Sequence, residues 1–527
     1  MPHPLRLLMA QINPTVGAIH ANTQKIQHII ETHQDQHIIV FPELAITGYP
    51  PDDLLLRTRL YQEVEESLTR LQHRIKNTYV ILGHPSTDGV HRYNSASIFY
   101  QGQRVALYHK QHLPHTTVFD EYRYFTPGPS TACVFDLQGE RCGLCICEDL
   151  WQELTVQQFK AQQVTRVFCI NASPWHEGKE QQRRRIANLY AHQGMDVIYV
   201  NQVGGQDALV FDGQSFILDR TGHIQASAPA FVESNLEVHV HHHHWQAHIT
   251  PPLSRHQIIY QALVCGLKDY VEKNHFPGVL LGLSGGIDSA LSLLIAVDAL
   301  GPSRVHVVLM PSQYTALMSV EDAWEQLNQL HVRHTLLPIE PALDTILSTL
   351  APAFANTRAD LTEQNLQARI RGLFLMALSN KTGYMVISTS NKSESAVGYS
   401  TLYGDMCGGF CVLKDVYKTL VYALAKDDAR IPERCITRPP TAELAEDQTD
   451  QDDLPDYAIL DEIIQCYMEE NLDEDAIILR GHTKTLVSSI ITRIKRAEFK
   501  RQQAAPGVKI TACAFGKDWR YPITSGF

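Results

Sequence analysis

The sequence contains no long hydrophobic run, no low-complexity tract and no excess of positive charge. None of its apolar stretches reaches the roughly 20 residues that a membrane-spanning helix needs, so we expect no membrane partner. The 45 basic residues against 57 acidic ones give a net charge of −12, which argues against nucleic-acid binding. A hydrophobic content of 44% and a charged content of 19% are those of an ordinary folded protein.

Cysteine usage points to a reducing compartment. The chain of 527 residues carries 11 cysteines, an odd number without regular spacing. The apolar run near the N-terminus is too short for a secretion signal, so we expect free thiols in a cytoplasmic protein.

A chain of 527 residues is too long for one hydrophobic core, so at least two domains are expected. In residues 1–225, short apolar β runs alternate with helical patterns, which favours a sheet covered on both faces. From residue 257 the alternation restarts and predicts a doubly wound parallel sheet, with a ligand crevice at the carboxyl ends of its strands. We expect domains at residues 1–245 and 257–527, joined by a linker at residues 246–256.

Two polar segments have no clear place in these domains. Residues 226–256 as a whole look like a connector, and they contain His239 and the run from His241 to His244. Such a run could bind a metal, but neighbouring side chains on a strand point to opposite faces, and an exposed segment between domains explains it better. Residues 447–453 are acidic and polar and are predicted to form a solvated loop.

The string Ser-Gly-Gly-Ile-Asp-Ser at residues 284–289 follows an apolar run at residues 278–282 and precedes a helical pattern. Strand, tight turn and helix in this order make an anion site, since backbone N–H groups and the helix start both favour phosphate. The hydroxyls of Ser284 and Ser289 can donate to phosphate oxygens, whereas Asp288 repels phosphate and therefore suggests a bound cation. The string lacks the Gly-Lys-Ser/Thr ending of a P-loop and resembles the pyrophosphate loop of ATP pyrophosphatases, which adenylate a substrate.

A second candidate site lies in the first half, where Cys147 ends an apolar strand. A nucleophile at a sharp strand end is exposed and rigidly held, and its thiol needs a base and a stabilising cation. Glu43 and Lys110 stand at two other strand ends. A buried carboxylate can accept the thiol proton and pass it to a leaving amine, while a lysine ammonium stabilises thiolate and oxyanion.

The spacing of Cys142, Cys145 and Cys147 also allows a metal cluster. Strand alternation places Cys145 and Cys147 on one face and Cys142 on the other, and no matching Cys/His pair flanks them, which disfavours zinc. A cysteine in a strand is also commonly a packed core residue.

The Phe-Pro-Glu, Lys-x-x-Leu-Pro and Ile-Cys-Glu-Asp segments around Glu43, Lys110 and Cys147 resemble, in that order, the nitrilase-superfamily amidases. The resemblance implies a four-layer α-β-β-α sandwich. It also implies Glu43 as general base, Lys110 as oxyanion support and Cys147 as the nucleophile that forms a thioester. Glu121 would be a supporting second carboxylate.

Further strings in the second half resemble glutamine-dependent NAD synthetases, and with the phosphate loop this resemblance covers nearly the whole chain. The strings lie at residues 362–372, 388–394, 397–405, 439–444 and 515–517. The implied C-terminal fold is a doubly wound parallel sheet of the ATP-pyrophosphatase (adenine nucleotide α-hydrolase-like) type. The resemblance assigns glutamine binding to Thr116, Ser173 and Lys179. It assigns ATP binding to Gly282, Ser284, Gly285, Gly286, Ile287, Asp288, Ser289, Thr389, Lys418 and Thr441. It assigns deamido-NAD binding to Asn365, Arg369, Glu394 and Lys517, with Mg²⁺ held by Asp288 and Glu394.

The same resemblance implies a ligase with two linked reactions, which complete NAD biosynthesis. ATP adenylates deamido-NAD⁺ with release of pyrophosphate, and ammonia freed from L-glutamine then displaces AMP to give NAD⁺. Homo-oligomers are common in the family and are expected here.

Two alternatives to this function stay open. The acceptor could be another carboxylate that ATP activates, or the first half could only bind glutamine or be structural while free ammonia feeds the second half. Four positions depart from the family pattern, although none is a catalytic candidate or part of the phosphate loop. They are Thr116, Ala208, Ala316 and Ser390.

Overall fold

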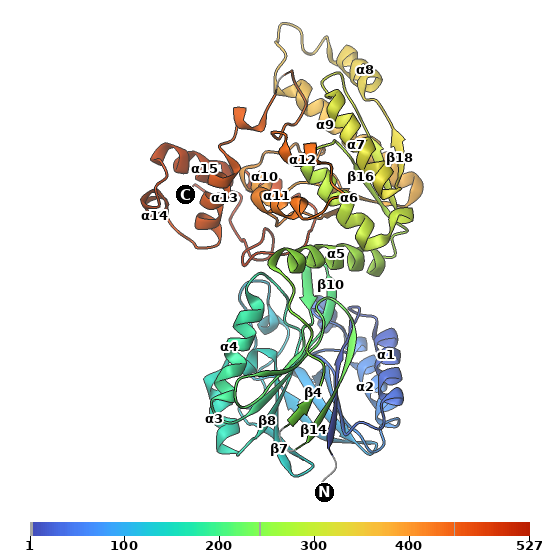
Figure 1. Ribbon diagram of the computed structural model, residues 1–527, viewed down its shortest axis with the longest axis vertical. Helices are drawn as coiled ribbons and strands as arrows, with labels where there is room; N and C mark the ends of the chain where they lie inside the picture. Colours follow the sequence, from blue (N-terminus) through green and yellow to red (C-terminus); the bar gives the residue numbers. More distant parts are fainter. Residues whose placement is uncertain (1–3, 242–243, 447, 527) are drawn as a thin grey trace. The chain divides into compact units, whose positions relative to one another are not determined.

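The computed structural model describes residues 4–241, 244–446 and 448–526, and the chain divides into two units, Met1–Ser254 and Arg255–Phe527 (Figure 1). Each unit has hydrophobic cores of its own, as expected for a chain too long for one core. Within the described ranges, no helix is both long and apolar enough to cross a membrane.

Among the residues described, the N-terminal unit contains a seven-stranded sheet in the order β15-β14-β1-β2-β3-β4-β5 and a six-stranded sheet in the order β13-β12-β9-β8-β7-β6. The first sheet consists of β1 (Leu5–Gln11), β2 (Ile38–Val40), β3 (Tyr79–Thr87), β4 (Arg92–Tyr100), β5 (Gln103–His109), β14 (Ser234–His241) and β15 (His244–Gln246). The second consists of β6 (Cys133–Leu137), β7 (Glu140–Ile146), β8 (Arg166–Asn171), β9 (Asp196–Asn201), β12 (Phe216–Leu218) and β13 (Ile224–Ser227). A separate hairpin joins β10 (Val203–Gln206) to β11 (Leu209–Asp212).

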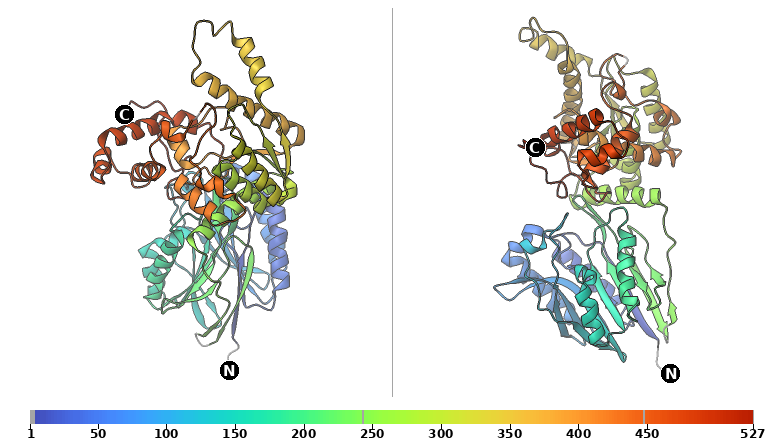
Figure 2. Two further views of the ribbon diagram at one scale, coloured as in Figure 1. Left: turned by 45° about the horizontal axis from the view of Figure 1, so that its top comes forward. Right: turned by 90° about the vertical axis from the view of Figure 1, so that its left-hand side faces the viewer.

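The two large sheets pack face to face, and helices cover their outer faces (Figure 2). The first sheet is covered by α1 (Ile19–Thr32) and α2 (Thr58–Gln72), the second by α3 (Glu153–Ala161) and α4 (Lys179–Ala191). Strand β1 shows why its sequence is continuously apolar: Leu7 and Met9 face the other sheet, while Leu8 and Ala10 face the helices. The expected α-β-β-α sandwich is thereby confirmed.

The expectation that residues 226–256 form a connector is wrong for strand β14, which pairs antiparallel with β1 along its whole length. Leu236, Val238 and Val240 are buried between the sheets, and polar residues alternate with them. His239 occupies one of these alternating positions. His242 and His243 lie outside the described residues, and the described part of the chain holds no group of three or more side chains that could bind a metal.

The C-terminal unit is built on a parallel sheet which, over the described residues, has five strands in the order β18-β17-β16-β19-β20. The strands are β16 (Val279–Gly282), β17 (Val305–Leu309), β18 (Arg333–Leu336), β19 (Met385–Ser388) and β20 (Phe410–Cys411). The associated helices are α5 (Arg255–Lys273), α6 (Ile287–Leu300), α7 (Leu317–Leu330), α8 (Glu340–Leu350), α9 (Leu361–Thr382), α10 (Lys392–Val397), α11 (Lys418–Lys426) and α12 (Glu433–Thr437). The chain winds first to one side of β16 and then to the other, so a crevice is expected at the carboxyl ends of β16 and β19.

A group of C-terminal helices forms a core of its own beside this sheet. The helices are α13 (Tyr457–Met468), α14 (Glu474–Leu479), α15 (Lys484–Arg496) and α16 (Glu498–Arg501). Ile464, Ile490 and Phe515 pack there against Val397 of α10, which anchors the C-terminal segment next to the sheet.

Phe168 tests the core between the two N-terminal sheets, where it is fully buried with its ring 5.8 Å from that of Phe135. Phe168→Ala should lower the free energy of unfolding of the N-terminal unit by about 3–5 kcal/mol, because burial is lost and a cavity is left. Urea denaturation measures this. Leu189→Ala, on the exposed face of α4, should change the same quantity by less than about 0.5 kcal/mol. Equal losses in the two variants would contradict the assignment of this core.

Candidate active sites

Cys147 begins a sharp turn directly after β7 ends at Ile146. Its backbone lies in the left-handed region, with φ of 46°, which a residue with a side chain adopts only under constraint. The carboxylate of Asp149 supplies a constraint by accepting a hydrogen bond from the Ile146 N–H at 3.2 Å. The expectation that Cys145 and Cys147 share one face is wrong, because the strand ends first: Cys145 packs toward the helices and Cys147 toward the other sheet.

The thiol of Cys147 is buried next to a cluster of ionised groups. Burial raises the pKa of this thiol well above its usual value; the charge of Glu43 raises it further and that of Lys110 opposes the shift. A thiol in this environment is protonated at neutral pH, so it needs a base before it can attack.

The expected base and cation are in direct contact. The ammonium of Lys110 lies 2.8 Å from one oxygen of Glu43 and 2.8 Å from one oxygen of Glu121, and all three side chains are at most 5% exposed. Burial alone lowers the pKa of Lys110, but the charges of Glu121 and Glu43 outweigh it and raise that pKa well above its usual value. Burial is also the main reason why the pKa of Glu121 is raised to about 6.

Two residues that sequence reasoning missed hold these carboxylates in place. Asn94 on β4 donates to Glu43 at 2.7 Å, and the hydroxyl of Tyr49 donates to Glu121 at 2.8 Å. The backbone N–H of Ala172 donates to the second oxygen of Glu43 at 2.8 Å. Asn94 stands in no distinctive string, so a single sequence offers no signal for it.

Asp149 is a third missed residue, although it stands inside the Ile-Cys-Glu-Asp string. Besides the Ile146 N–H, its carboxylate accepts the N–H groups of Gln111 and His112 at 3.0 and 2.8 Å and the hydroxyl of Tyr108 at 2.9 Å. Burial raises its pKa to about 6. Asp149 thus connects the turn of Cys147 to the segment that follows Lys110.

Two of the three residues expected at glutamine lie close to this cluster. Ser173 is buried and follows Ala172, whose N–H contacts Glu43. Lys179 starts α4 with its ammonium 4.4 Å from the centre of the Trp151 ring, and its charge lowers the pKa of Glu148, the residue after Cys147, although burial raises that pKa overall. Thr116 is exposed, and its carbonyl accepts the N–H of Phe119 at 3.1 Å.

The phosphate loop lies between β16 and α6, as its sequence predicts. Gly285 has φ of +79°, and a Cβ there would lie 2.2 Å from the carbonyl oxygen of Ser319, so no other residue fits. The hydroxyls of Ser284 and Ser289 lie 3.1 Å apart, and Gly286 caps the start of α6. The loop therefore presents the positive end of the helix and two hydroxyls to one side.

Charged residues gather beside this loop. The ammonium of Lys418 contacts the carboxylates of both Asp288 and Glu394, the latter at 3.0 Å, and Asn391 donates to Asp288 at 2.9 Å. Burial is the main reason why the pKa of Glu394 is raised to about 7, while Asp288 and Glu394 together raise that of Lys418. Two carboxylates next to a phosphate loop supply the hard oxygen ligands that Mg²⁺ prefers, so these residues fit the ion that the sequence implies.

The prediction that residues 447–453 form a solvated loop is wrong for Asp450. Its side chain is buried, accepts the hydroxyl of Tyr457 at 2.8 Å and lines the same polar cavity as Lys418. A string of acidic residues signals exposure on average, and only the fold shows which member turns inward.

Two adjoining cavities open at the carboxyl ends of β16 and β19, at the expected crevice. The polar cavity is lined by residues 284 and 286–289 of the loop together with Glu394, Lys418, Thr441 and Asp450. The apolar one, about 270 Å³, is lined by aliphatic side chains of the strands and helices, with Gly282, Thr389 and Arg371. Ser284, Asp405, Ala442 and Glu443 line both. An apolar pocket that adjoins a polar one beside the start of a helix suits a nucleotide.

Three of the four residues expected at deamido-NAD line neither cavity. Asn365 accepts the hydroxyl of Thr401 at 2.7 Å, and the exposed Arg369 donates to the carbonyl of Leu402 at 3.2 Å, so both hold the segment at 401–402. Lys517 is exposed in the C-terminal segment. Sequence reasoning missed Arg371, two positions after Arg369, whose Nε donates to the carbonyl of Met310 at 3.0 Å.

Comparison with known proteins agrees with both folds. Two family models match in succession, carbon-nitrogen hydrolase over residues 6–248 and NAD synthase over residues 259–504. The glutamine-dependent NAD(+) synthetase of Acinetobacter baylyi is 45% identical over an alignment 537 positions long, which covers 99% of this chain and 98% of that protein. The protein of the same name from Xanthomonas campestris is 44% identical, with 100% and 98% covered.

Two solved structures match nearly the whole chain. Glutamine-dependent NAD+ synthetase from Acinetobacter baumannii, in complex with adenosine diphosphate, matches with a TM-score of 0.81 and 43% identity over 99% of both chains. A glutamine-dependent NAD(+) synthetase from Cytophaga hutchinsonii has the same fold, with a TM-score of 0.86 over 99% of this chain and 98% of that one at 21% identity.

An amidase-like sandwich and an NAD synthase sheet in one chain define a carbon–nitrogen ligase of two units. At 45% identity over nearly its whole length, the chain belongs to the glutamine-dependent NAD(+) synthetases, EC 6.3.5.1. The family resemblance inferred from the sequence is therefore confirmed.

The collision at Gly285 gives a test of the phosphate loop. Gly285→Ala should weaken ATP binding about 100-fold, because the methyl group displaces the loop from Ser319. Isothermal titration with ATP measures this. Gly301→Ala is the matched control, since Gly301 has the same φ of +79° at the other end of α6 but no atom within 4 Å of the added Cβ. ATP binding that survives in Gly285→Ala would contradict the assignment of the loop.

The N-terminal cluster predicts a pH dependence. Glu121 and Asp149 have pKa values raised to about 6, so both are charged at neutral pH and take up protons as the pH falls through 6. Protonation removes the charge that holds Lys110 and the acceptors that fix the turn of Cys147. Glutamate release at saturating glutamine should therefore decline between about pH 7 and 5. A flat profile over this interval would show that neither group matters for the reaction.

Proposed function

We propose that the chain makes NAD⁺ from deamido-NAD⁺, ATP and L-glutamine, with glutamine hydrolysed at Cys147 and the amide formed beside the phosphate loop. The observation that carries the proposal is the ammonium of Lys110, buried 2.8 Å from both Glu43 and Glu121; the charges of Lys110 and Glu43 act on the buried thiol of Cys147. Buried ion pairs add little stability, so a purely structural or glutamine-binding unit would gain nothing from this arrangement, whereas an amidase needs all of its parts.

In the first half-reaction Glu43 acts as a proton shuttle. It takes the proton of the Cys147 thiol as the sulfur attacks the carboxamide carbon of glutamine, and Lys110 stabilises the developing oxyanion. Glu43 then gives that proton to the leaving nitrogen as the C–N bond breaks, which releases ammonia and leaves a thioester. Water attacks the thioester, Glu43 receives its proton, and glutamate leaves with the thiol restored.

In the second half-reaction the nicotinate carboxylate of deamido-NAD⁺ attacks the α-phosphorus of ATP, and pyrophosphate leaves. The N–H groups at the start of α6 and the hydroxyls of Ser284 and Ser289 hold the departing phosphates. Asp288 and Glu394 would hold Mg²⁺, which, when bound, offsets the charge on pyrophosphate. Ammonia then attacks the acyl adenylate, loses a proton and displaces AMP.

The remaining assignments extend this proposal to the substrates. ATP would contact Gly282, Gly285, Gly286, Ile287, Thr389, Lys418 and Thr441. Deamido-NAD⁺ would contact Asn365, Arg369, Glu394 and Lys517, and glutamine Thr116, Ser173 and Lys179. The enzyme would act as a homo-oligomer in the cytoplasm, a placement supported by its 11 free cysteines.

Cys147→Ala separates the two half-reactions. The variant should lose NAD⁺ formation with glutamine by at least about 1,000-fold, because no thioester forms, yet keep the wild-type rate with ammonium. The measurement is NAD⁺ formation from deamido-NAD⁺, ATP and Mg²⁺ with each nitrogen source.

Two results would contradict the proposal. A Cys147→Ala enzyme that still uses glutamine would remove the nucleophile from Cys147. A wild-type enzyme that makes no NAD⁺ from either nitrogen source would show that the acceptor is another carboxylate.

A further inference from the structure

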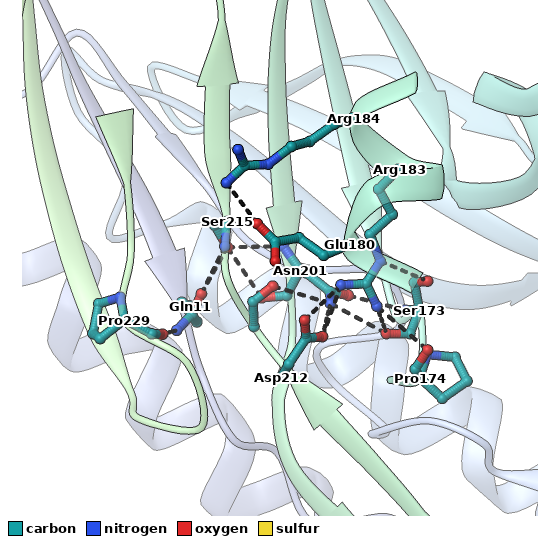
Figure 3. A network of polar contacts seen from close by, with 11 residues as sticks. Gln11, Ser173, Pro174, Glu180, Arg183, Arg184, Asn201, Asp212, Ser215 and Pro229 are labelled. Carbon is teal, nitrogen blue, oxygen red and sulfur yellow. Dashed lines mark hydrogen bonds and ion pairs between the residues drawn. The ribbon is translucent and has the colours of Figure 1, made fainter. Parts of the chain in front are cut away.

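The guanidinium of Arg183 on α4 is fully occupied inside the N-terminal unit, at 2% exposure (Figure 3). One terminal nitrogen donates to both oxygens of Asp212 at 2.8 Å. The other donates to the carbonyls of Ser173 at 2.7 Å and Pro174 at 3.3 Å, and Nε donates to the Ser173 hydroxyl at 3.3 Å. All three nitrogens are therefore used, which leaves Arg183 no direct contact to offer a substrate.

The segment that Arg183 holds carries two parts of the site. The N–H of Ala172 binds Glu43 at 2.8 Å, and the next residue, Ser173, is a proposed contact for glutamine. A shift of this segment would therefore move the base and the substrate together. Asn201 holds the segment from a second side, since its side chain accepts the Ser173 N–H at 2.9 Å and donates to the Ser173 carbonyl at 3.2 Å.

These contacts lie at the edge of the sheet that carries the nucleophile. Strands β7, β8 and β9 are parallel neighbours, so Cys147 after β7, Ser173 after β8 and Asn201 at the end of β9 share the carboxyl edge. The network continues from Asn201 to Ser215 and from Ser215 to Gln11 on the opposite sheet, each at 3.0 Å (Figure 3). The segment that Arg183 holds is thus connected by hydrogen bonds to both sheets.

We propose that Arg183 and Asp212 form a positioning pair for glutamine hydrolysis. The pair fixes residues 172–174 so that Glu43 and Ser173 are both correctly placed for the substrate. The inference rests on the proposed glutaminase at Cys147. A lysine at position 183 keeps one charge for Asp212 but cannot reach the two carbonyls, the hydroxyl and the carboxylate at once.

The same unit contains two matched controls. Arg166 and Asp196 form another buried pair, 2% exposed on each side and 3.6 Å apart, but at the starts of β8 and β9, the opposite edge of the sheet. Arg184, next to Arg183, is 44% exposed and pairs with Glu180 on the surface of α4 (Figure 3). Arg166→Lys reports how much activity is lost when a buried arginine is disturbed. Arg184→Lys reports how much is lost when the sequence of α4 is changed.

The experiment compares Arg183→Lys, Asp212→Asn, Arg166→Lys and Arg184→Lys in the full-length enzyme. Steady-state kinetics with glutamine and with ammonium are measured for each, together with thermal unfolding. In Arg183→Lys, kcat/KM for glutamine should fall about 100-fold, since displacements near 1 Å have this effect. Both a raised KM, through Ser173, and a lowered kcat, through Glu43, should contribute, and ammonium-driven synthesis should stay at the wild-type rate. Asp212→Asn should also lower kcat/KM for glutamine and leave ammonium-driven synthesis unchanged.

The outcomes separate a positioning role from a structural one. Loss of glutamine use in the Arg183 and Asp212 variants alone, with wild-type behaviour in the Arg166 and Arg184 variants, supports the proposal. Equal losses in Arg183→Lys and Arg166→Lys, or unchanged glutamine kinetics in Arg183→Lys, overturn it. If Cys147→Ala still uses glutamine, the glutaminase assignment itself fails, so the two failures are distinguishable.

Discussion

A buried ammonium ion must be compensated, and the N-terminal site is organised around this requirement at Lys110. Its charge is balanced by Glu43 and Glu121, which are themselves held by Asn94 and Tyr49. Because the three ions leave water together, removal of Lys110 would leave two neighbouring carboxylates without a counter-ion in a medium that stabilises charge poorly. The same arrangement keeps Lys110 charged and close to a base, which is what attack on a carboxamide requires.

The two sites use polar groups in different ways. In the N-terminal unit, side chains from distant parts of the chain converge, and the charged ones are each fixed by several hydrogen bonds. In the C-terminal unit, a short loop between β16 and α6 supplies most of the candidate anion site through its own backbone, so the string at residues 284–289 points to it directly. A site formed by one contiguous string can be recognised in a sequence, whereas a site formed by side chains from distant segments can be recognised only once the fold is known.

This difference between the two sites explains which parts of the fold and of the sites could be predicted from the sequence. Apolar runs predicted most strands, and the short strings around Cys147 and the phosphate loop pointed to both candidate sites. Strand β14 was missed because polar residues, among them Asn235, Glu237 and His239, alternate with only three buried side chains. Asn94 and Arg183 were missed because the carboxylates they bind, Glu43 and Asp212, lie 51 and 29 residues away, and no local pattern encodes such contacts.

The resting state of Cys147 has a consequence for the survival of the enzyme. Peroxides and other cellular oxidants react with thiolates, and sulfinic or sulfonic products would inactivate the enzyme permanently. Burial raises the pKa of this thiol. In the proposed mechanism, the anion therefore arises only when Glu43 takes the proton during turnover. An enzyme that is not turning over therefore keeps its sulfur as the thiol, which oxidants attack most slowly. Its rate of oxidation should increase with the number of turnovers rather than with the time since its synthesis.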